Sequence, residues 1–194
     1  MKKKVGTVCI ILGIALIIGA LSLFMYNQLE AKKAEKSAEK ILPQVVEAIE
    51  GNIENIPDPY DPTMTAEEID GYNYIGYLAI PDLGLKLPIM EEWDYTRLKI
   101  APCRYFGSTK TNDLVLAAHN YLWHFGKLSR LKLGAEMIFT DMDGVSKHYA
   151  VEDVYVASPY VIEEVTSGEY DLTLFTCTYG GRSRVIVRCM EVKN

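Results

Sequence analysis

A cysteine near the end of the chain is the residue whose position most suggests chemistry. Cys177 lies in the stretch DLTLFTCTYGGRSRVIVRC, residues 171–189, which has the pattern of two strands joined by a glycine turn. The thiol comes where the first strand ends, and two arginines, Arg182 and Arg184, follow within seven residues. A nearby cation lowers the pKa of a thiol and so favours the nucleophilic thiolate. The segment therefore predicts a reactive cysteine beside a turn.

The register of the expected hairpin decides which arginine meets the thiol. If YGGR, residues 179–182, forms the turn, paired residues have numbers that sum to 361, so Cys177 lies opposite Arg184 and Leu172 opposite Cys189. A register shifted by one residue would turn Arg184 to the other face of the hairpin. In the first register, Arg184 can lower the thiol pKa and hold a carbonyl oxygen as negative charge develops on it.

Three histidines are candidates for the base that such a thiol needs. His119 directly follows the apolar strand DLVLAA, where a side chain emerges at the rim of a barrel. His124, in the loop NYLWHFG, is its rival, and His148 lies in a strand where a solvated face is its expected place. On residue type alone, a lone histidine at the position of His119 is more often structural than catalytic. A cysteine, a rim histidine and an arginine nevertheless suffice for acyl transfer through a thioester.

The other cysteines bear on the same question. Cys9 lies in an apolar N-terminal segment, and Cys103, Cys177 and Cys189 lie beyond it, so at least one of these three is unpaired. A buried core thiol is the alternative account of Cys177, and its place beside a turn argues against it. No CxxC or HxxxH spacing indicates a metal site, so none is expected.

The first element of the chain is an apolar segment. No charged residue occurs from Val5 to Leu29, and the 21 positions VGTVCIILGIALIIGALSLFM would span about 30 Å as a helix, the thickness of a hydrocarbon core. A cleaved signal peptide is the alternative, but its apolar region is usually ~7–15 residues long. We therefore expect an uncleaved anchor over residues 5–26. The lysines within residues 1–4 predict a cytoplasmic tip and a catalytic part outside the cell.

Residues 27–70 are expected to form an acidic stalk. They hold 4 Lys/Arg against 11 Asp/Glu, whereas residues 71–194 are nearly balanced with 13 against 15. The stretch QLEAKKAEKSAEKILPQVVEAIEG has helical composition, and Pro43 is expected to interrupt that helix or to begin a second one. NIPDPYDPTMTAEEIDG is typical of an extended linker. No basic stripe is available to grip phosphates, so nucleic acid is not an expected partner.

From Gly71 onward the pattern changes to short strands. Tyr, Val, Ile and Thr are enriched in seven segments, and Pro, Gly, Asp and Asn mark the breaks between them. DMDG, residues 141–144, is a hairpin signal, and short helices are expected only around residues 91–100 and 125–131. This strand density predicts an all-β fold, either a closed barrel or a sandwich. The expected strands are residues 74–80, 85–90, 113–118, 135–141, 147–157, 171–177 and 184–192.

Together these segments resemble the sortases, the cysteine transpeptidases of Gram-positive cell surfaces. LTLFTC, followed by a basic residue before an apolar strand, resembles the signature of that family, and DLVLAAHN resembles the strand that ends at its active-site histidine. GYLAIPDLGLKLPI resembles the first two strands, and HFGKLSRLKLGAEMIF the segment after the histidine. The resemblance covers residues 71–194, the expected catalytic domain. It implies a closed eight-stranded β-barrel that contains short helices and is preceded in the chain by the transmembrane helix.

The resemblance also implies roles for individual residues. It makes His119 the acid–base, Cys177 the nucleophile and Arg184 the arginine immediately before the last apolar strand. Arg182 lies two residues too early for that pattern, but it stays a candidate because the turn is short. As further candidates that contact the substrate or support the catalytic pair we name Asn120 and Thr176. The implied chemistry requires no metal and no organic cofactor.

The implied reaction starts from a surface protein or pilin with an LPXTG-like sorting signal at its C-terminus. The thiolate attacks a Thr–Gly or similar bond, and the resulting thioester is resolved by an amine of a peptidoglycan precursor or by a pilin lysine. Attachment to the cell wall is the main expectation, and pilus polymerisation differs from it only in the amine. A tethered barrel that only binds peptides, with a structural Cys177, is the non-catalytic alternative. The sequence leaves the sortase subclass, the sorting motif and the acceptor open.

One further motif precedes the barrel. Asp58, Pro59 and Tyr60 resemble the Asp-Pro-aromatic lid that occupies the groove in pilus-building sortases. Asp58 would pair with Arg184, and the ring of Tyr60 would cover Cys177. A proline-stiffened linker explains the same composition equally well, so both interpretations stay open.

Overall fold

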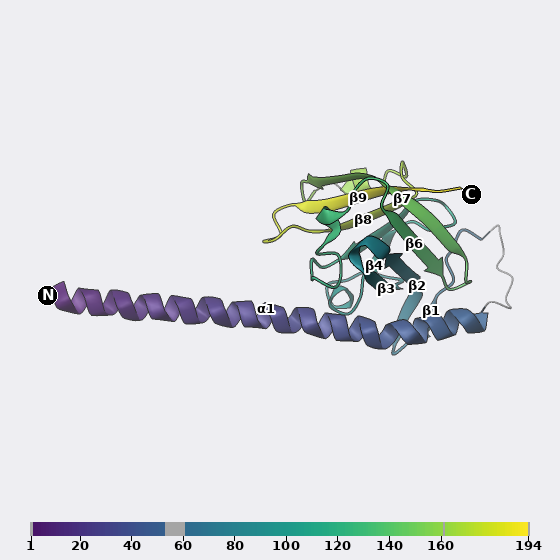
Figure 1. Cartoon of the computed structure of the whole chain (residues 1–194). Helices are drawn as coiled ribbons and strands as arrows, with labels where there is room; N and C mark the ends of the chain where they lie inside the picture. The colour runs from purple at the N-terminus through teal and green to yellow at the C-terminus, as the bar shows by residue number, and fades with distance from the viewer. Residues whose placement is uncertain (1, 53–60, 161, 194) are drawn as a thin grey trace.

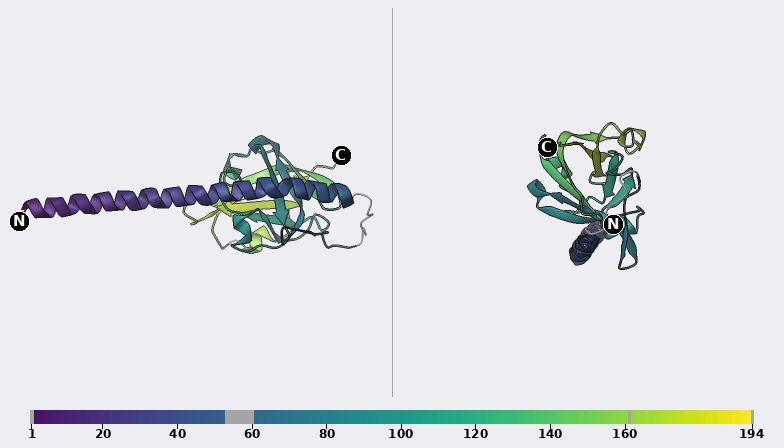
Figure 2. Two further views of the ribbon diagram at one scale, coloured as in Figure 1. Left: turned by 90° about the horizontal axis from the view of Figure 1, so that it is seen from below. Right: turned by 90° about the vertical axis from the view of Figure 1, so that its right-hand side faces the viewer.

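The computed structural model describes residues 2–52, 61–160 and 162–193. Helix α1 (Lys2–Asn52) runs from the N-terminus and along the outside of a β-barrel (Figures 1 and 2). Its 51 residues extend over about 75 Å. The break expected at Pro43 is wrong, since the helix continues through this residue. Pro43 is exposed, and the buried neighbours Ile41 and Val45 hold the helix on the barrel, which offsets the hydrogen bond that proline cannot donate.

The C-terminal half of α1 is packed on the barrel rather than free in solvent. Two polar contacts fix it there: Lys40 Nζ lies 2.5 Å from Asp70, and Asn52 Nδ2 donates to Glu67 at 3.1 Å. Most of the buried stripe packs in one cluster with barrel residues such as Met90. Much of the segment expected as a stalk therefore covers one side of the barrel. The stripe follows helical spacing and consists of Ala34, Ala38, Ile41, Val45 and Ile49.

Eight strands close into a mixed barrel, in the order β2-β3-β4-β5-β8-β9-β7-β6, with β6 pairing back onto β2. The pairs β3–β4 and β5–β8 are parallel and the others antiparallel. This confirms the predicted closed eight-stranded fold. The strands of the ring are β2 (Tyr72–Ile80), β3 (Leu85–Met90), β4 (Cys103–Phe106), β5 (Leu114–Ala118), β6 (Glu136–Asp141), β7 (Ser146–Ala157), β8 (Leu172–Cys177) and β9 (Arg184–Glu191).

Seven of these eight strands lie within two residues of the predicted bounds, and the hairpin predicted at DMDG joins β6 to β7. The sequence analysis missed β4 and also β1 (Glu67–Ile69), which extends the sheet beyond the ring by pairing with the start of β2. The two predicted helices are single 3₁₀ turns, η2 (Arg97–Lys99) and η3 (Leu128–Arg130). Two further short elements among the described residues are η1 (Pro81–Leu83) and α2 (Ile162–Val165).

The ring closes at Gly76. This residue pairs with Ile89 of β3 on one side and with Asp141 of β6 on the other, at a bulge in β2. Its φ of +139° is accessible to glycine, and a Cβ built there would lie 2.0 Å from the carbonyl oxygen of Thr140. Because that approach leaves no room for a side chain, a glycine is required where β2 meets β6.

Candidate active site

Two parallel strands bring the predicted cysteine and histidine to one place. Strands β5 and β8 pair in parallel, with Ala118 opposite Thr176. Neighbouring parallel strands end at the same edge of a sheet, so the next residues along each chain, His119 and Cys177, emerge at the same level. Both side chains line a groove of about 260 Å³ on the outer face of the barrel.

The hairpin of β8 and β9 supplies the third group. Cys177 pairs with Arg184 and Leu172 with Cys189, which confirms the register predicted from the glycine turn. Directly opposed residues of an antiparallel pair project from the same face, so the thiol and the guanidinium share the groove. Arg184 is accordingly among the residues that line it.

The turn itself holds the guanidinium. Arg184 Nη1 donates to the carbonyls of Gly181 and Ser183, each at 3.1 Å. The turn is closed by the backbone hydrogen bond from Thr178 to Ser183 at 2.9 Å. Arg182 is exposed at the tip of the same turn and is not among the residues that line the groove.

Aromatic side chains build the walls of the groove. The rings of Tyr105 and Phe175 meet edge to face with centroids 5.0 Å apart, and Trp93 lies 5.2 Å from Tyr105. These walls present an apolar surface beside the side chains of His119, Cys177 and Arg184. The lining residues are Trp93, Tyr95, Leu98, Tyr105, Ala117, Ala118, His119, Pro159, Val165, Phe175, Thr176, Cys177, Arg184 and Ile186.

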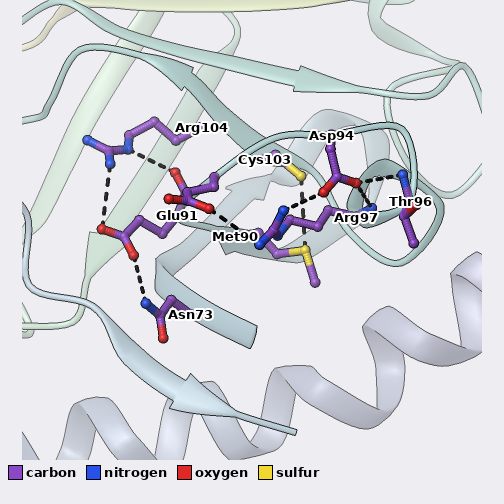
Figure 3. Close-up of polar contacts among 9 residues, drawn as sticks. Asn73, Met90, Glu91, Asp94, Thr96, Arg97, Cys103 and Arg104 are labelled. Carbon is purple, nitrogen blue, oxygen red and sulfur yellow. Dashed lines mark hydrogen bonds and ion pairs between the residues drawn. The ribbon is translucent and has the colours of Figure 1, made fainter. Parts of the chain in front are cut away.

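A network of polar contacts fixes the loop that carries Trp93 and Tyr95 (Figure 3). Asp94 accepts hydrogen bonds from the backbone N–H groups of Thr96 at 2.6 Å and Arg97 at 2.7 Å, and it also pairs with the Arg97 side chain. These contacts hold the backbone where η2 begins. The same loop is tied to β4, because the Arg104 Nε donates to the backbone carbonyl of Glu91 at 3.0 Å. The aromatic wall therefore rests on a loop that these polar contacts hold in place.

His119 is suited to accept a proton at neutral pH. Its side chain is half-buried, and this burial lowers its pKa below the ordinary value, with a smaller effect from the charge of Lys99. A neutral imidazole is the form that takes a proton from a thiol. The ring of Tyr121 lies 5.0 Å away and supports one side of the imidazole.

The other two histidines lie elsewhere. His124, the predicted rival, is fully buried, and burial lowers its pKa to about 4, an effect that the backbone of Ala34 on α1 partly opposes. His148 is exposed on β7, as predicted, with its Nδ1 2.8 Å from Glu136. Of the three histidines, His119 alone lines the groove.

The four cysteines are all unpaired, and they differ in access. Cys103 and Cys189 are buried, and burial raises the pKa of both thiols, that of Cys103 to about 12. Each thiol packs on the thioether sulfur of a methionine: Cys103 Sγ lies 4.0 Å from Met90 Sδ, and Cys189 Sγ lies 3.7 Å from Met137 Sδ. Cys177 is the partly exposed thiol of the barrel, and Cys9 lies on the exposed apolar part of α1.

Comparison with known proteins identifies the family of this chain. Residues 78–192 match the family model described as the sortase domain. This chain belongs to the sortase family. Its members are transpeptidases, and membership supports that activity for this sortase. The resemblance noted in the sequence is thereby confirmed at the level of the family.

Solved sortases of several classes share the fold. Sortase C1 from Streptococcus suis is 26% identical, with 62% of this chain and 74% of that chain covered and a TM-score of 0.54. The Clostridium perfringens sortase D5 transpeptidase is 18% identical over 84% of this chain and 99% of its own, with a TM-score of 0.59. Sortase A from Corynebacterium diphtheriae is 18% identical over 91% of this chain and 96% of its own, with a TM-score of 0.58. No curated protein matches the chain. Because classes A, C and D all appear, the subclass stays open.

Two residues of this sortase connect the histidine strand to the cysteine strand. Thr176 is 3% exposed, and its Oγ1 donates to the carbonyl of Ala118 at 2.8 Å. Asn120 Nδ2 donates to the carbonyl of Thr178 at 3.4 Å. The first contact lies directly before the catalytic candidates and the second directly after them, so both bear on the distance between His119 and Cys177.

Sequence reasoning missed the walls of the groove. Trp93, Tyr95 and Tyr105 are three aromatic residues within thirteen positions, and this clustering was the available signal. The predicted lid, Asp58, Pro59 and Tyr60, lies outside the described residues and stays a prediction. Within the part of the chain that the structure describes, no group of three or more His, Cys, Asp or Glu side chains is placed to hold a metal ion.

Proposed function

We propose that this sortase is a membrane-anchored cysteine transpeptidase in which Cys177 is the nucleophile, His119 the acid–base and Arg184 the carbonyl-binding group. The observation that carries the proposal is that these three side chains, from β8, the end of β5 and β9, line one groove. A thiol, a neutral imidazole and a forked cation are the groups that acyl transfer through a thioester needs.

The first half of the reaction forms the acyl-enzyme. His119 accepts the proton of the Cys177 thiol, and the thiolate attacks the carbonyl carbon of the Thr–Gly bond in an LPXTG-like signal. The guanidinium of Arg184 stabilises the negative charge that develops on the carbonyl oxygen. The C–N bond then breaks, His119 gives its proton to the leaving amine, and a thioester with Cys177 remains.

The second half transfers the protein to an acceptor. An amine of a peptidoglycan precursor attacks the thioester, His119 takes a proton from this amine, and the C–S bond breaks. His119 then gives the proton to the Cys177 thiolate, which regenerates the thiol and the neutral imidazole. The aromatic walls formed by Trp93, Tyr105 and Phe175 offer an apolar surface for the leucine and proline of the signal. Every step uses side chains of this chain and none requires a cofactor.

The membrane part of the proposal rests on α1. Within the described residues it is the one helix long and apolar enough to cross a membrane, which is compatible with anchoring. We place the lysines of residues 1–4 in the cytoplasm and the barrel outside the cell, since positive flanks remain on the cytoplasmic side. The surface proteins that carry the signal would then meet the groove outside the cell.

A pilin lysine is the alternative acceptor. A similar solved structure, 22% identical over 84% of this chain, is described as a pilus-related sortase C of group B Streptococcus. The Asp58–Tyr60 lid belongs to this alternative. If it covers Cys177, Asp58→Ala with Tyr60→Ala should clearly accelerate alkylation of that thiol. An unchanged alkylation rate would leave the segment as a linker and favour attachment to the cell wall.

The central test uses thiol chemistry. In a Cys9→Ser background, Cys177 should react with iodoacetamide faster than the buried Cys103 and Cys189, and a sorting-signal peptide should produce a thioester detectable by mass spectrometry. Cys177→Ala should remove the thioester and leave the circular dichroism spectrum unchanged. Equal labelling of the three thiols, or a thioester in the Cys177→Ala protein, would instead favour the non-catalytic peptide-binding barrel.

A further inference from the structure

The segment that follows His119 differs in charge from the rest of this acidic chain. No acidic residue occurs between Asp113 and Glu136, although the whole chain has 26 and a net charge of −6. The same segment contributes Lys127, Arg130 and Lys132 to one surface cleft, whose other lining residues are Asp82 and Leu83. Three cations therefore face solvent together, with one carboxylate beside them.

Large apolar side chains are exposed next to these cations. Leu122 is 52% exposed, Trp123 42% and Leu133 70%. Lys127 Nζ lies 4.1 Å from the centre of the Trp123 ring, so the cationic and aromatic parts form one surface. We name it the basic-aromatic patch, and its members are Leu122, Trp123, Lys127, Arg130, Lys132 and Leu133. Tryptophan and leucine beside lysine and arginine are typical of surfaces that lie in the membrane interface.

The position of the patch along α1 points to the same partner. His124, next to Trp123, is buried close to Ala34 of the helix. Tyr121 lies near Glu30 and Tyr26, whose charges add to the effect of burial in raising its pKa. The uncharged stretch of the helix ends at Leu29, so the barrel begins to contact α1 where the helix leaves the apolar region.

The distances bring the loop close to the headgroup layer. Tyr26 is the last residue of the proposed anchor, and Ala34 lies eight residues beyond it, about 12 Å along a helix. The polar layer on each side of a bilayer is about 5–8 Å thick. Ala34 therefore lies just beyond this layer, whereas Tyr121, which lies near Tyr26 and Glu30, reaches toward the end of the anchor. Leu122 and Trp123 directly follow Tyr121 in the loop, so their exposed side chains are within reach of the headgroups. The β8–β9 turn also lies at the end of the barrel that faces the N-terminal half of α1 (Figure 1), and Tyr179 at its tip is 97% exposed.

We infer that the basic-aromatic patch docks on the bilayer that α1 crosses, with Leu122 and Trp123 in the interface and the three cations against anionic lipid headgroups. This inference rests on the anchoring role proposed for α1. Because the patch begins three residues after His119, docking would hold the groove at the membrane surface. The groove would then be within reach of substrates that are themselves attached to the membrane.

The chain offers a matched pair of probes, because its two tryptophans are Trp123 in the patch and Trp93 in the groove wall. The full chain would be reconstituted into vesicles of phosphatidylcholine and phosphatidylglycerol with and without brominated acyl chains. In Trp93→Phe, where Trp123 is the remaining fluorophore, bromolipid should reduce emission about twofold or more, as expected for a ring in the interface. In Trp123→Phe, the emission of Trp93 should stay nearly constant.

Charge variants test the headgroup contact. Each basic residue near an anionic surface contributes about fivefold to binding, so Arg130→Gln with Lys132→Gln should weaken docking on the order of tenfold or more and lower the quenching of Trp123. The matched control, Lys86→Gln with Lys193→Gln, removes two exposed charges outside the patch and should leave the quenching unchanged. Vesicles of phosphatidylcholine alone should reproduce the effect of the patch variant.

The outcomes separate this inference from the proposed function. If the chain floats with the vesicles and Trp123 is quenched no more than Trp93, docking is overturned while anchoring stands. A chain that fails to float overturns the anchor and docking together. Quenching that survives the loss of Arg130 and Lys132 overturns the assignment of an anionic surface as the partner. Peptide cleavage measured in detergent tests catalysis separately, and its failure would not change the quenching.

Discussion

Replacing Thr176 with valine tests whether one buried hydroxyl holds together the two segments that carry the proposed catalytic residues His119 and Cys177. Threonine and valine have a similar shape, so the change removes a hydroxyl and little else. Thr176 is 3% exposed, and its Oγ1 donates to the carbonyl of Ala118 at 2.8 Å. Ala118 directly precedes His119, and Thr176 directly precedes Cys177. The hydrogen bond therefore connects the two backbone segments that carry the proposed base and the proposed nucleophile.

The expected magnitude follows from burial. Leaving a buried group without its hydrogen-bond partner costs about 1–3 kcal/mol, so Thr176→Val should lower the free energy of unfolding by about 1–2 kcal/mol. A displacement of reacting groups by about 1 Å can cost roughly 100-fold in rate. We therefore expect thioester formation to slow about 10–100-fold. The measurements are denaturant unfolding followed by circular dichroism and single-turnover acylation with a sorting-signal peptide.

A matched control lies three residues earlier on the same strand. Thr173 is 2% exposed, and its Oγ1 accepts a hydrogen bond from Arg188 Nη1 at 3.1 Å, but it does not line the groove. Thr173→Val should lose a comparable amount of stability and keep nearly normal acylation. If the two variants acylate at the same rate, the Thr176 hydroxyl contributes to the fold alone, and the positioning argument is refuted.

Three further predictions concern other parts of the structure. Arg184→Lys should slow acylation about tenfold or more, because a point charge lacks the forked donor geometry, whereas Arg182→Ala should be nearly silent; the reverse ranking would exchange their roles. Ile41 is 4% exposed on α1, so Ile41→Ala should lower the free energy of unfolding by about 2–4 kcal/mol. The control Glu47→Ala, at an exposed position of the same helix, should lower it by less than about 0.5 kcal/mol. Equal unfolding midpoints for the two variants would mean that the helix is a free stalk. Burial lowers the pKa of His124 to about 4 in the folded chain, below the ~6.5 of an unfolded histidine. Between these two values the unfolded chain binds one more proton than the folded chain. The free energy of unfolding should therefore fall as the pH falls through this window, by about 3 kcal/mol in full. His124→Leu should lose most of this slope in unfolding measured from pH 7 to pH 4, and an unchanged slope would contradict the assignment.

Local sequence patterns were sufficient to predict most strands of the barrel. Placing the turn at YGGR predicted the observed register of β8 and β9, because a hairpin places partners at fixed offsets from its turn, and the structure excludes the register shifted by one residue. Strand β4 was missed because its segment, CRYF, contains a charge and follows Pro102, and its contact with β3 is a single parallel pair between Met90 and Cys103. A pairing between segments thirteen residues apart leaves no periodic signal in either one.

The packing of α1 and the walls of the groove could not be predicted for a different reason. The buried stripe of the helix includes Ala34 and Ala38, which look unremarkable in a run of Ala, Lys and Glu until the outer face of the barrel is present. His119 and His124 are five residues apart in one loop, and only the position of α1 over the second shows which of them reaches the groove. Both outcomes depend on surfaces that form after the ring has closed.

The continuity of α1 changes how the enzyme would search for its substrates. A flexible stalk made from the 44 residues of the expected segment 27–70 would let the barrel wander roughly 35 Å from its anchor. Instead one unbroken helix joins the apolar half to the half packed on the barrel. If the apolar half is the proposed anchor, the barrel and the anchor would move together as one rigid body. Each partner would then encounter the groove by lateral diffusion in a layer of fixed height. In such a layer, confinement of both reactants raises their effective concentration without any additional contact between them.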